Sequence, residues 1–277
     1  MDTRPIGIFD SGLGGLTAVK EILHLLPNEN IIYFGDTGRV PYGTRSKETI
    51  IKYAKQDIAF LQSKQVKMII AACGTVSSAA GHIGNALPLP FTGVVKPTAQ
   101  AACLATKNQR IGVIGTTATI KSGSYKQAIH EINPGIQVFM QDCPLFVPLV
   151  ENGFTSPDSE IVLSVIRHYL QPFQQADIDT LILGCTHYPL LYHAIKKVMG
   201  KDVFLVDSGR ETAVYATYLL EKQNLRSNNN KKGSCTFYVS DSIEGFTQSA
   251  NIFLQKNTAK TVAYIDIEAF SQNLTKK

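Results

Sequence analysis

The sequence has no uninterrupted apolar run that approaches the roughly 18 residues a membrane-spanning helix requires. Its first twelve residues contain Asp2, Arg4 and Asp10, where a secretory signal peptide has an apolar core. Only 18% of the 277 residues are charged, and the 44% that are hydrophobic suffice for a large buried core. We therefore expect a folded cytoplasmic protein without a membrane anchor.

The five cysteines form neither a disulfide framework nor a zinc site. Their number is odd, they lie far apart, and no two of them make a C-x-x-C pair. We predict no metal site and expect free thiols, at least some of them reactive, at Cys73, Cys103, Cys143, Cys185 and Cys235.

A concentrated basic stripe is also missing. The chain has 27 Lys and Arg against 22 Asp and Glu, a net charge of +5, but the basic residues are scattered apart from short clusters such as Lys231-Lys232. Nucleic-acid binding normally needs a basic patch on one face. We therefore predict a solvated surface and no nucleic-acid partner.

The common phosphate-binding loops are absent as well. A G-x-G-x-x-G fingerprint that begins at Gly12 would need glycine at position 17, where Thr17 stands, and residues 43–47 lack the G-x-x-x-x-G-K-[ST] motif. What remains is a tight glycine turn that carries Asp10 and Ser11. Such a turn can hold a charged small ligand against backbone amides, or Asp10 or Ser11 can simply cap the next helix.

Short apolar runs alternate with amphipathic segments along nearly the whole chain. This alternation is typical of β-α units, so we predict an α/β fold with parallel sheets. Helices are predicted after Ser46, over positions 50–61, and from Ser156-Pro157, over positions 162–170, while residues 227–233 are expected to form an exposed polar loop. The predicted strands are 5–9, 31–34, 67–72, 91–94, 110–114, 137–140, 180–183, 203–206 and 235–239.

Three segments of the first half are echoed in the same order in the second half. The pairs are IGIFDS at 6–11 with IGVIGT at 111–116, YFGD at 33–36 with FMQD at 139–142, and MIIAACGT at 68–75 with LILGCT at 181–186. The preserved order predicts two similar doubly wound halves. Each half then places a cysteine at the carboxyl end of a strand.

Cys73 and Cys185 are those cysteines. Ligands bind beyond the carboxyl ends of strands in open α/β sheets, where helix N-termini present free N–H groups. There we expect a depressed thiol pKa and a usable thiolate fraction near neutral pH. Most free cysteines are instead small buried apolar residues, which is our interpretation of Cys103, Cys143 and Cys235.

His187 follows Cys185 closely enough to influence the thiol or a substrate proton. The other five histidines lie in helical patterns and are expected at the surface or in packing. Glu151 is either an acid of the second half or an ordinary loop carboxylate. Asp36 either faces a ligand or accepts hydrogen bonds in its loop, and a rigid turn at Tyr42 and Gly43 follows.

The motifs gain specificity from their joint order between residue 6 and about residue 209. They are DSGLGGL at 10–16, GD at 35–36, PYG at 41–43, AC at 72–73 with Thr75, IGTTAT at 114–119, GCTHYPLL at 184–191 and DSG at 207–209. Together they resemble the bacterial glutamate racemases of the aspartate/glutamate racemase family.

The resemblance implies two α/β domains, residues 1–97 with 208–277 and residues 98–207, with the active site in the cleft between them. It implies interconversion of L- and D-glutamate, which supplies D-glutamate for peptidoglycan. One thiolate, of Cys73 or Cys185, would remove the α-proton and the opposite thiol would return a proton, without pyridoxal phosphate, another cofactor or a metal. It leaves a homodimer open.

The resemblance also implies roles for further residues. Asp10 would assist near Cys73, and His187 and Glu151 would assist near Cys185. The implied substrate contacts are Asp10, Ser11, Tyr42, Gly43, Gly74, Thr75, Thr117, Thr186 and His187. Because only nine residues precede Asp10, we expect none of the activation by a wall-precursor nucleotide that an N-terminal extension gives some members.

Gly74 departs from the family pattern, which usually has asparagine there. Glycine keeps the backbone N–H for a carboxylate but loses a side-chain hydrogen bond, worth about 1.5–3 kcal/mol to a charged group. A racemase of aspartate or another acidic amino acid therefore stays open, although His187 favours the glutamate branch, since the aspartate enzymes usually have glutamate there. A catalytically silent protein that binds an acidic metabolite is a further alternative.

Overall fold

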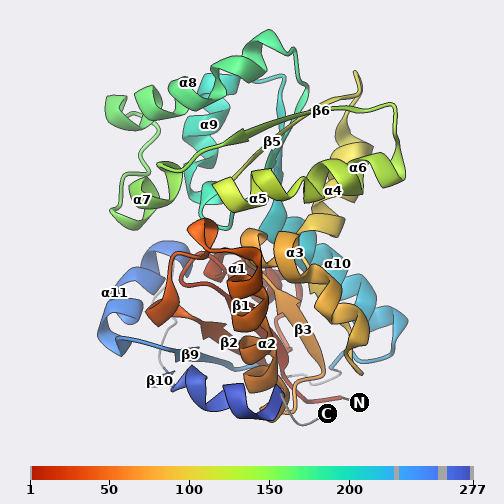
Figure 1. The fold of residues 1–277 in the computed structure, drawn as a ribbon, viewed down its shortest axis with the longest axis vertical. Helices are drawn as coiled ribbons and strands as arrows, with labels where there is room; N and C mark the ends of the chain where they lie inside the picture. Colours follow the sequence, from red (N-terminus) through yellow and green to blue (C-terminus); the bar gives the residue numbers. More distant parts are fainter. Residues whose placement is uncertain (1, 228–230, 255–260, 275–277) are drawn as a thin grey trace.

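The strands build two parallel sheets, one in each lobe of the molecule (Figure 1). The computed structural model describes residues 2–227, 231–254 and 261–274. The sheet of the first lobe contains β1 (Ile6–Asp10), β2 (Ile31–Gly35), β3 (Met68–Ala71), β4 (Phe91–Gly93), β9 (Cys235–Val239) and β10 (Val262–Tyr264). The sheet of the second lobe contains β5 (Arg110–Gly115), β6 (Gln137–Asp142), β7 (Thr180–Leu183) and β8 (Phe204–Asp207).

The helices connect these strands and cover both faces of each sheet. The α-helices are α1 (Leu16–Leu25), α2 (Lys47–Ser63), α3 (Gly74–Ala80), α4 (Val95–Ala105), α5 (Thr117–Ser122), α6 (Ser124–Ile132), α7 (Phe146–Glu151), α8 (Glu160–Gln175), α9 (Tyr192–Met199), α10 (Ser208–Lys222) and α11 (Ile243–Leu254). Short 3-10 segments are η1 (Thr37–Arg39), η2 (Tyr42–Thr44), η3 (Gly81–Ala86), η4 (Tyr188–Leu191) and η5 (Ile267–Leu274).

The two sheets share a strand order, as the echoed sequence segments predict. The order is β2-β1-β3-β4 in the first lobe and β6-β5-β7-β8 in the second, and every adjacent pair is parallel. The C-terminal strands β9 and β10 extend the first sheet beyond β2. The α/β class with doubly wound parallel sheets is thus confirmed, whereas the exact domain boundaries stay a prediction.

Successive side chains of the buried strands point to opposite faces of the first sheet, and helices cover both faces. Ile8 and Ile70 pack in one core cluster with α1, α10 and α11, while Phe9 and Ile69 pack in another with α2 and Ile267 of η5. The first of these clusters continues across the seam into the second lobe, where it includes residues of α8 and α9. This cluster therefore joins the apolar cores of the two lobes.

The structure changes a few of the expected elements. Helix α8 begins at Glu160 and not at Ser156-Pro157, because the backbone turns first, with a hydrogen bond from Ser159 N to Ser156 O. Strand β10 was not predicted, because its three residues lack the Pro and Gly that mark the two ends of the equally short strand β4. Within the predicted loop at 227–233, residues 228–230 lie outside the described residues.

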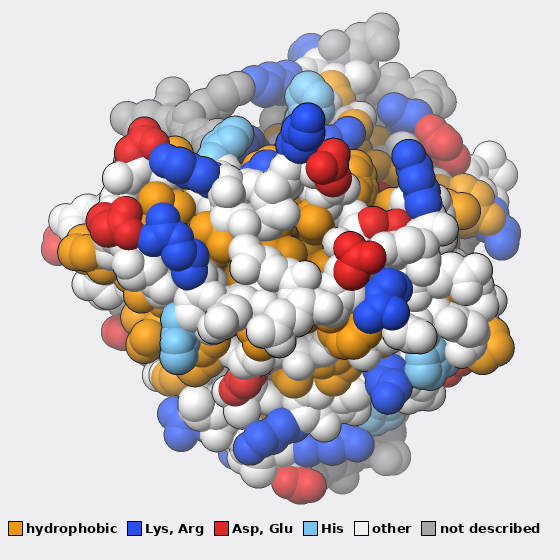
Figure 2. All heavy atoms as spheres, turned by 90° about the horizontal axis from the view of Figure 1, so that it is seen from above, with side chains coloured by type: hydrophobic (Ala, Val, Ile, Leu, Met, Phe, Trp, Pro, Cys, Tyr) orange, Lys and Arg blue, Asp and Glu red, His pale blue; other side chains and the backbone are white. Residues whose placement is uncertain are grey.

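Charges of both signs share the outer end of the second lobe. Figure 2 shows Lys and Arg side chains interspersed with Asp and Glu on this face, without a continuous basic stripe. Across the part of the chain that the structure describes, no helix is long and apolar enough to cross a membrane.

Candidate active site

A cavity of about 380 Å³ lies where the carboxyl ends of strands from the two lobes meet. Equivalent loops of the two lobes build it: the residues after β1, β2 and β3 on one side, and those after β5, β6 and β7 on the other. The lining residues are Ser11, Gly12, Val40, Pro41, Tyr42, Gly43, Thr44, Cys73, Gly74, Thr75, Thr116, Thr117, Cys143, Pro144, Val147, Pro148, Glu151, Gly184, Cys185, Thr186 and His187.

Cys73 is one of three cysteines that line this cavity, with Cys143 and Cys185. It directly precedes α3 and is 5% exposed, and its Sγ donates a hydrogen bond to Ser11 Oγ at 3.5 Å. Burial, helped by the negative charge of Asp10, raises the pKa of Cys73 to about 12. The predicted depressed pKa is therefore wrong for this residue, because desolvation outweighs the start of a short helix. Cys73 is a thiol at neutral pH.

Cys185, another of these cysteines, belongs to a chain of contacts that leads out of the cavity. Its Sγ lies 3.9 Å from His187 Nδ1, and His187 Nε2 lies 3.0 Å from Glu151 Oε1. Burial opposes a charge on His187, but hydrogen bonds with Cys185 and Glu151 outweigh it and raise the pKa of His187 to about 10. The imidazole thus carries a positive charge beside Cys185 at neutral pH, with the ring of Phe253 in α11 perpendicular to it at 5.4 Å.

Asp10 lies behind the cavity and is not among its lining residues. The carboxyl is fully buried and accepts a hydrogen bond from Gly12 N at 3.0 Å on Oδ2, while Oδ1 has no partner among the described residues. Burial raises the pKa of Asp10, and the charge of His187 opposes this rise. The negative charge of Asp10 raises the pKa of both Cys73 and His187, and the substrate contact expected of Asp10 from the sequence stays a prediction.

Threonine hydroxyls surround the thiols. Thr75 Oγ1 and Thr116 Oγ1 are hydrogen bonded across the two lobes at 3.0 Å, and Thr117 Oγ1 donates to Asp142 Oδ2 at 2.7 Å. The carbonyl of Thr186 accepts a hydrogen bond from Thr17 Oγ1 of the opposite lobe at 3.0 Å. The Thr75–Thr116 and Thr17–Thr186 contacts join the lobes at the edge of the cavity, whereas the Thr117–Asp142 contact lies within the second lobe.

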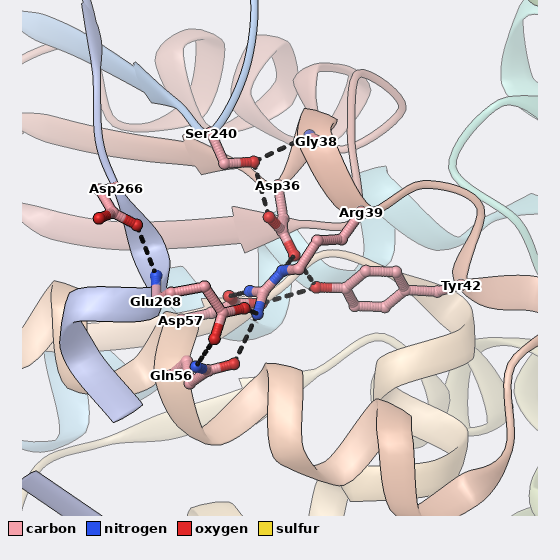
Figure 3. A network of polar contacts seen from close by, with 9 residues as sticks. All are labelled: Asp36, Gly38, Arg39, Tyr42, Gln56, Asp57, Ser240, Asp266 and Glu268. Atoms are coloured by element: carbon pink, nitrogen blue, oxygen red, sulfur yellow. Dashed lines mark hydrogen bonds and ion pairs between the residues drawn. The ribbon is translucent and has the colours of Figure 1, made fainter. Parts of the chain in front are cut away.

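Tyr42 and Gly43 belong to the wall formed by residues 40–44. The hydroxyl of Tyr42 turns away from the cavity and donates to Asp36 Oδ2, with Asp57 Oδ2 at 3.4 Å (Figure 3). Tyr42 still lines the cavity, and the substrate contact predicted for it stays a prediction. Asp36 is fully buried and accepts hydrogen bonds from Arg39 and Ser240. Of the two roles considered from the sequence, this is the role of a hydrogen-bond acceptor in the loop.

Two glycines allow the lobes to approach closely. A Cβ atom at Gly74 would lie 2.3 Å from the carbonyl oxygen of Gly184, and one at Gly14 would lie 2.1 Å from Thr186 Oγ1. No side chain fits at either position unless the seam shifts. Gly74 thus lies directly against the backbone of Gly184 and Cys185.

Sequence reasoning missed several lining residues, above all Thr116, Cys143 and Pro144. Cys143 was expected to be a packing residue, but it is 1% exposed and also borders the cavity. The signal that could have found it is the internal duplication: the loop after β6 is equivalent to the loop after β2, which carries Pro41 and Tyr42. Cys103 and Cys235 lie outside the lining, with partly exposed side chains.

The site is equipped for proton transfer. It joins three thiols, a charged imidazole and several hydroxyls in a partly enclosed space. The described residues contain no group of three or more His, Cys, Asp or Glu positioned to hold a metal ion. Backbone N–H groups at the starts of α3 and α5 have no intrahelical partner and can receive a carboxylate.

Known proteins share both the sequence and the fold. Residues 14–216 match the Asp/Glu/Hydantoin racemase family. The glutamate racemase of Geobacter metallireducens is 45% identical over 255 residues, which cover 92% of this chain and 94% of that protein. The solved structure of the Francisella tularensis glutamate racemase with D-glutamate has a TM-score of 0.90 at 40% identity and covers 97% of this chain and 100% of its own. A Bacillus anthracis glutamate racemase isoform reaches 0.91 at 37% identity, covering 96% and 98%.

Proposed function

Because the chain belongs to the Asp/Glu/hydantoin racemase family, and within it to the glutamate racemases, we propose that Cys73 and Cys185 interconvert L- and D-glutamate by proton exchange at the α-carbon. The observation that carries the assignment is the pair Cys73 and Cys185, two buried thiols that line the same cavity from equivalent strand ends of the two lobes. The reaction supplies D-glutamate for peptidoglycan and draws on the protein's own side chains. The cytoplasmic location and the homodimer stay predictions.

The two thiols start in different surroundings. Cys73 holds its proton, since burial raises its pKa to about 12. The positive charge of His187 attracts negative charge to Cys185 Sγ, 3.9 Å away. We therefore assign Cys185 as the base and Cys73 as the acid for one enantiomer, with the roles exchanged for the other.

The step balances without a redox partner. The thiolate of Cys185 takes the α-proton and becomes a thiol, the electron pair stays on the substrate carbon, and the Cys73 thiol delivers its proton to the opposite face of that carbon. Cys73 is left as the thiolate. Product release and proton exchange with solvent, or the reverse reaction, restore the starting state.

The carbanion-like transition state is the main energetic difficulty. Fixed donors aimed at developing charge are most effective where water is excluded. The N–H groups of Gly74 and Thr75 at the start of α3 and of Thr117 at the start of α5, together with the Thr186 hydroxyl, border the cavity beside the two cysteines. We propose that they receive the substrate carboxylates and delocalise the charge that forms at the α-carbon.

The first prediction tests the reaction itself. With L- or D-glutamate in deuterated water and no added pyridoxal phosphate, deuterium should enter the α-position and the circular dichroism signal should decay to zero. Cys73→Ser and Cys185→Ser should each lower turnover by about 10³-fold or more, because each removes one of the two proton carriers. Cys235→Ser, whose thiol lies outside the cavity, is the matched control and should retain turnover.

Three results would count against the proposal. Thermal stabilisation by glutamate without α-proton exchange would indicate a silent binding protein. Faster exchange with aspartate than with glutamate in side-by-side assays would move the substrate to the aspartate branch. Full racemization by either serine variant would remove the two-thiol mechanism.

A further inference from the structure

A polar network lies behind the wall at residues 40–44, outside the proton-transfer site. Figure 3 shows its members converging from separate elements: Asp36 after β2, Arg39 in η1, Tyr42 in η2, Asp57 in α2 and Glu268 in η5. The carboxyls of Asp36 and Asp57 are fully buried. Polar groups of this kind are expensive to bury unless they are paired.

Arg39 is the centre of the network. Its Nε donates to Asp36 Oδ2 at 2.6 Å, its Nη2 to Asp57 Oδ1 at 3.1 Å, and its Nη1 to Glu268 Oε1 at 3.1 Å. The guanidinium also lies 4.0 Å above the ring centroid of Tyr53. One planar fork thus connects the loop after β2 with α2 and with the C-terminal segment, a geometry that lysine cannot reproduce.

Tyr42 connects the network to the cavity, because it lines the cavity and its hydroxyl binds Asp36. The residue is 1% exposed, its ring packs 5.3 Å from the ring of Tyr53, and its hydroxyl donates to the same Asp36 oxygen that Arg39 binds. Asp36 in turn accepts from Ser240 Oγ on Oδ1 at 2.7 Å. The segment that borders the substrate space is therefore fastened from behind at its aromatic residue.

The charges favour a role in positioning. Two buried carboxyls share one guanidinium, and burial together with the negative charge of Asp36 raises the pKa of Asp57 well above its usual value. Buried ion pairs contribute little net stability, because desolvation consumes most of the attraction. What such a network provides is a single defined geometry for the chain segments that it joins.

We propose that Arg39 and Tyr42 are positioning residues that hold the 40–44 wall in the shape that binds glutamate, through Asp36 and with Glu268 as the outer anchor. The inference rests on the proposed function, since it concerns the same cavity. Neither side chain needs to meet the substrate or a reacting proton. The network should therefore govern substrate affinity more than the chemical step.

The second prediction is a split between KM and kcat. Tyr42→Phe removes the hydroxyl and keeps the ring, so it should raise KM for glutamate about tenfold and leave kcat within about twofold. Tyr53→Phe is the matched control: it removes the neighbouring hydroxyl, which makes none of these contacts, and should leave both parameters unchanged. Arg39→Lys keeps the charge but not the fork and should raise KM as Tyr42→Phe does.

Steady-state kinetics in both directions, with thermal denaturation of each variant, decides the matter. An unchanged KM in Tyr42→Phe would overturn the inference. So would a fall in kcat that is proportional to the fraction of unfolded protein, because it would show a purely structural role. If Tyr42→Phe does not fold, Arg39→Lys provides the same readout. Turnover by the wild-type chain is measured first: its absence would refute the proposed function, whereas normal turnover with an unchanged KM in the variants would refute only the positioning role.

Discussion

Gly74 allows the two lobes to approach closely because it has no side chain, and the sequence alone did not reveal this role. From the sequence, its effect was the loss of a side-chain hydrogen bond to the substrate. In the structure, a Cβ atom at position 74 would lie only 2.3 Å from the carbonyl oxygen of Gly184. Because these two glycines adjoin Cys73 and Cys185, a change at position 74 moves one proton carrier relative to the other.

The third prediction concerns this contact. Gly74→Ala should force the seam apart and lower kcat/KM at least about tenfold, since small displacements of reacting groups have large effects on rate. Gly81→Ala, at the other end of α3, is the control, because a Cβ there meets no described atom within 4 Å and its backbone is already helical. Steady-state kinetics and melting curves test both. Equal kinetics in the two variants would contradict the steric explanation.

Single residues were predictable where a pattern repeats. Cys73, Cys185 and His187 were found because each follows a buried strand, and all three line the cavity. Asp10 lies at the end of a strand too, yet the chain folds over its carboxyl, and Tyr42 turns its hydroxyl away towards Asp36. Side-chain direction within a loop depends on partners far along the chain, and no local pattern records it.

Elements were predictable to within a few residues because apolar runs and caps are local signals. Strand β7 has the bounds predicted, and α2 begins directly after Ser46, whose Oγ accepts a hydrogen bond from Thr49 N. Thr116 caps α5 in the same way, accepting from Thr119 N. Thr116 differs from Ser46 in one respect, because it also binds Thr75 across the lobes.

The fourth prediction compares these two caps. Ser46→Ala and Thr116→Ala should each lower the free energy of unfolding by about 1 kcal/mol, the usual value of an N-cap side chain. Only Thr116→Ala also removes a contact between the lobes beside the cavity, so it alone should raise KM for glutamate. Denaturant unfolding and steady-state kinetics measure the two effects. A raised KM in Ser46→Ala would show that helix stability, and not the contact between lobes, controls binding.

The closeness of the two lobes is a property of the whole molecule. Thr17 meets Thr186, Thr75 meets Thr116 and Gly74 meets Gly184, all pairs far apart in sequence. The repeated sequence segments predicted two similar halves but not the contacts between them. Pairs of residues that meet across the seam between the lobes follow no period that a single sequence could show. A ligand in the cavity touches both lobes and should therefore stabilise the whole chain and not one half.

The fifth prediction follows from that coupling. A ligand at 100 times its Kd stabilises the folded state by about 2.7 kcal/mol, and each kcal/mol raises the melting temperature of a chain of this size by about 2–4 °C. Glutamate should thus raise the Tm by about 5–10 °C in a single transition. L-lysine, which has the same α-carbon groups but an opposite side-chain charge, should produce a much smaller rise. A glutamate-induced shift confined to one of two separate transitions would show that the lobes bind and unfold independently.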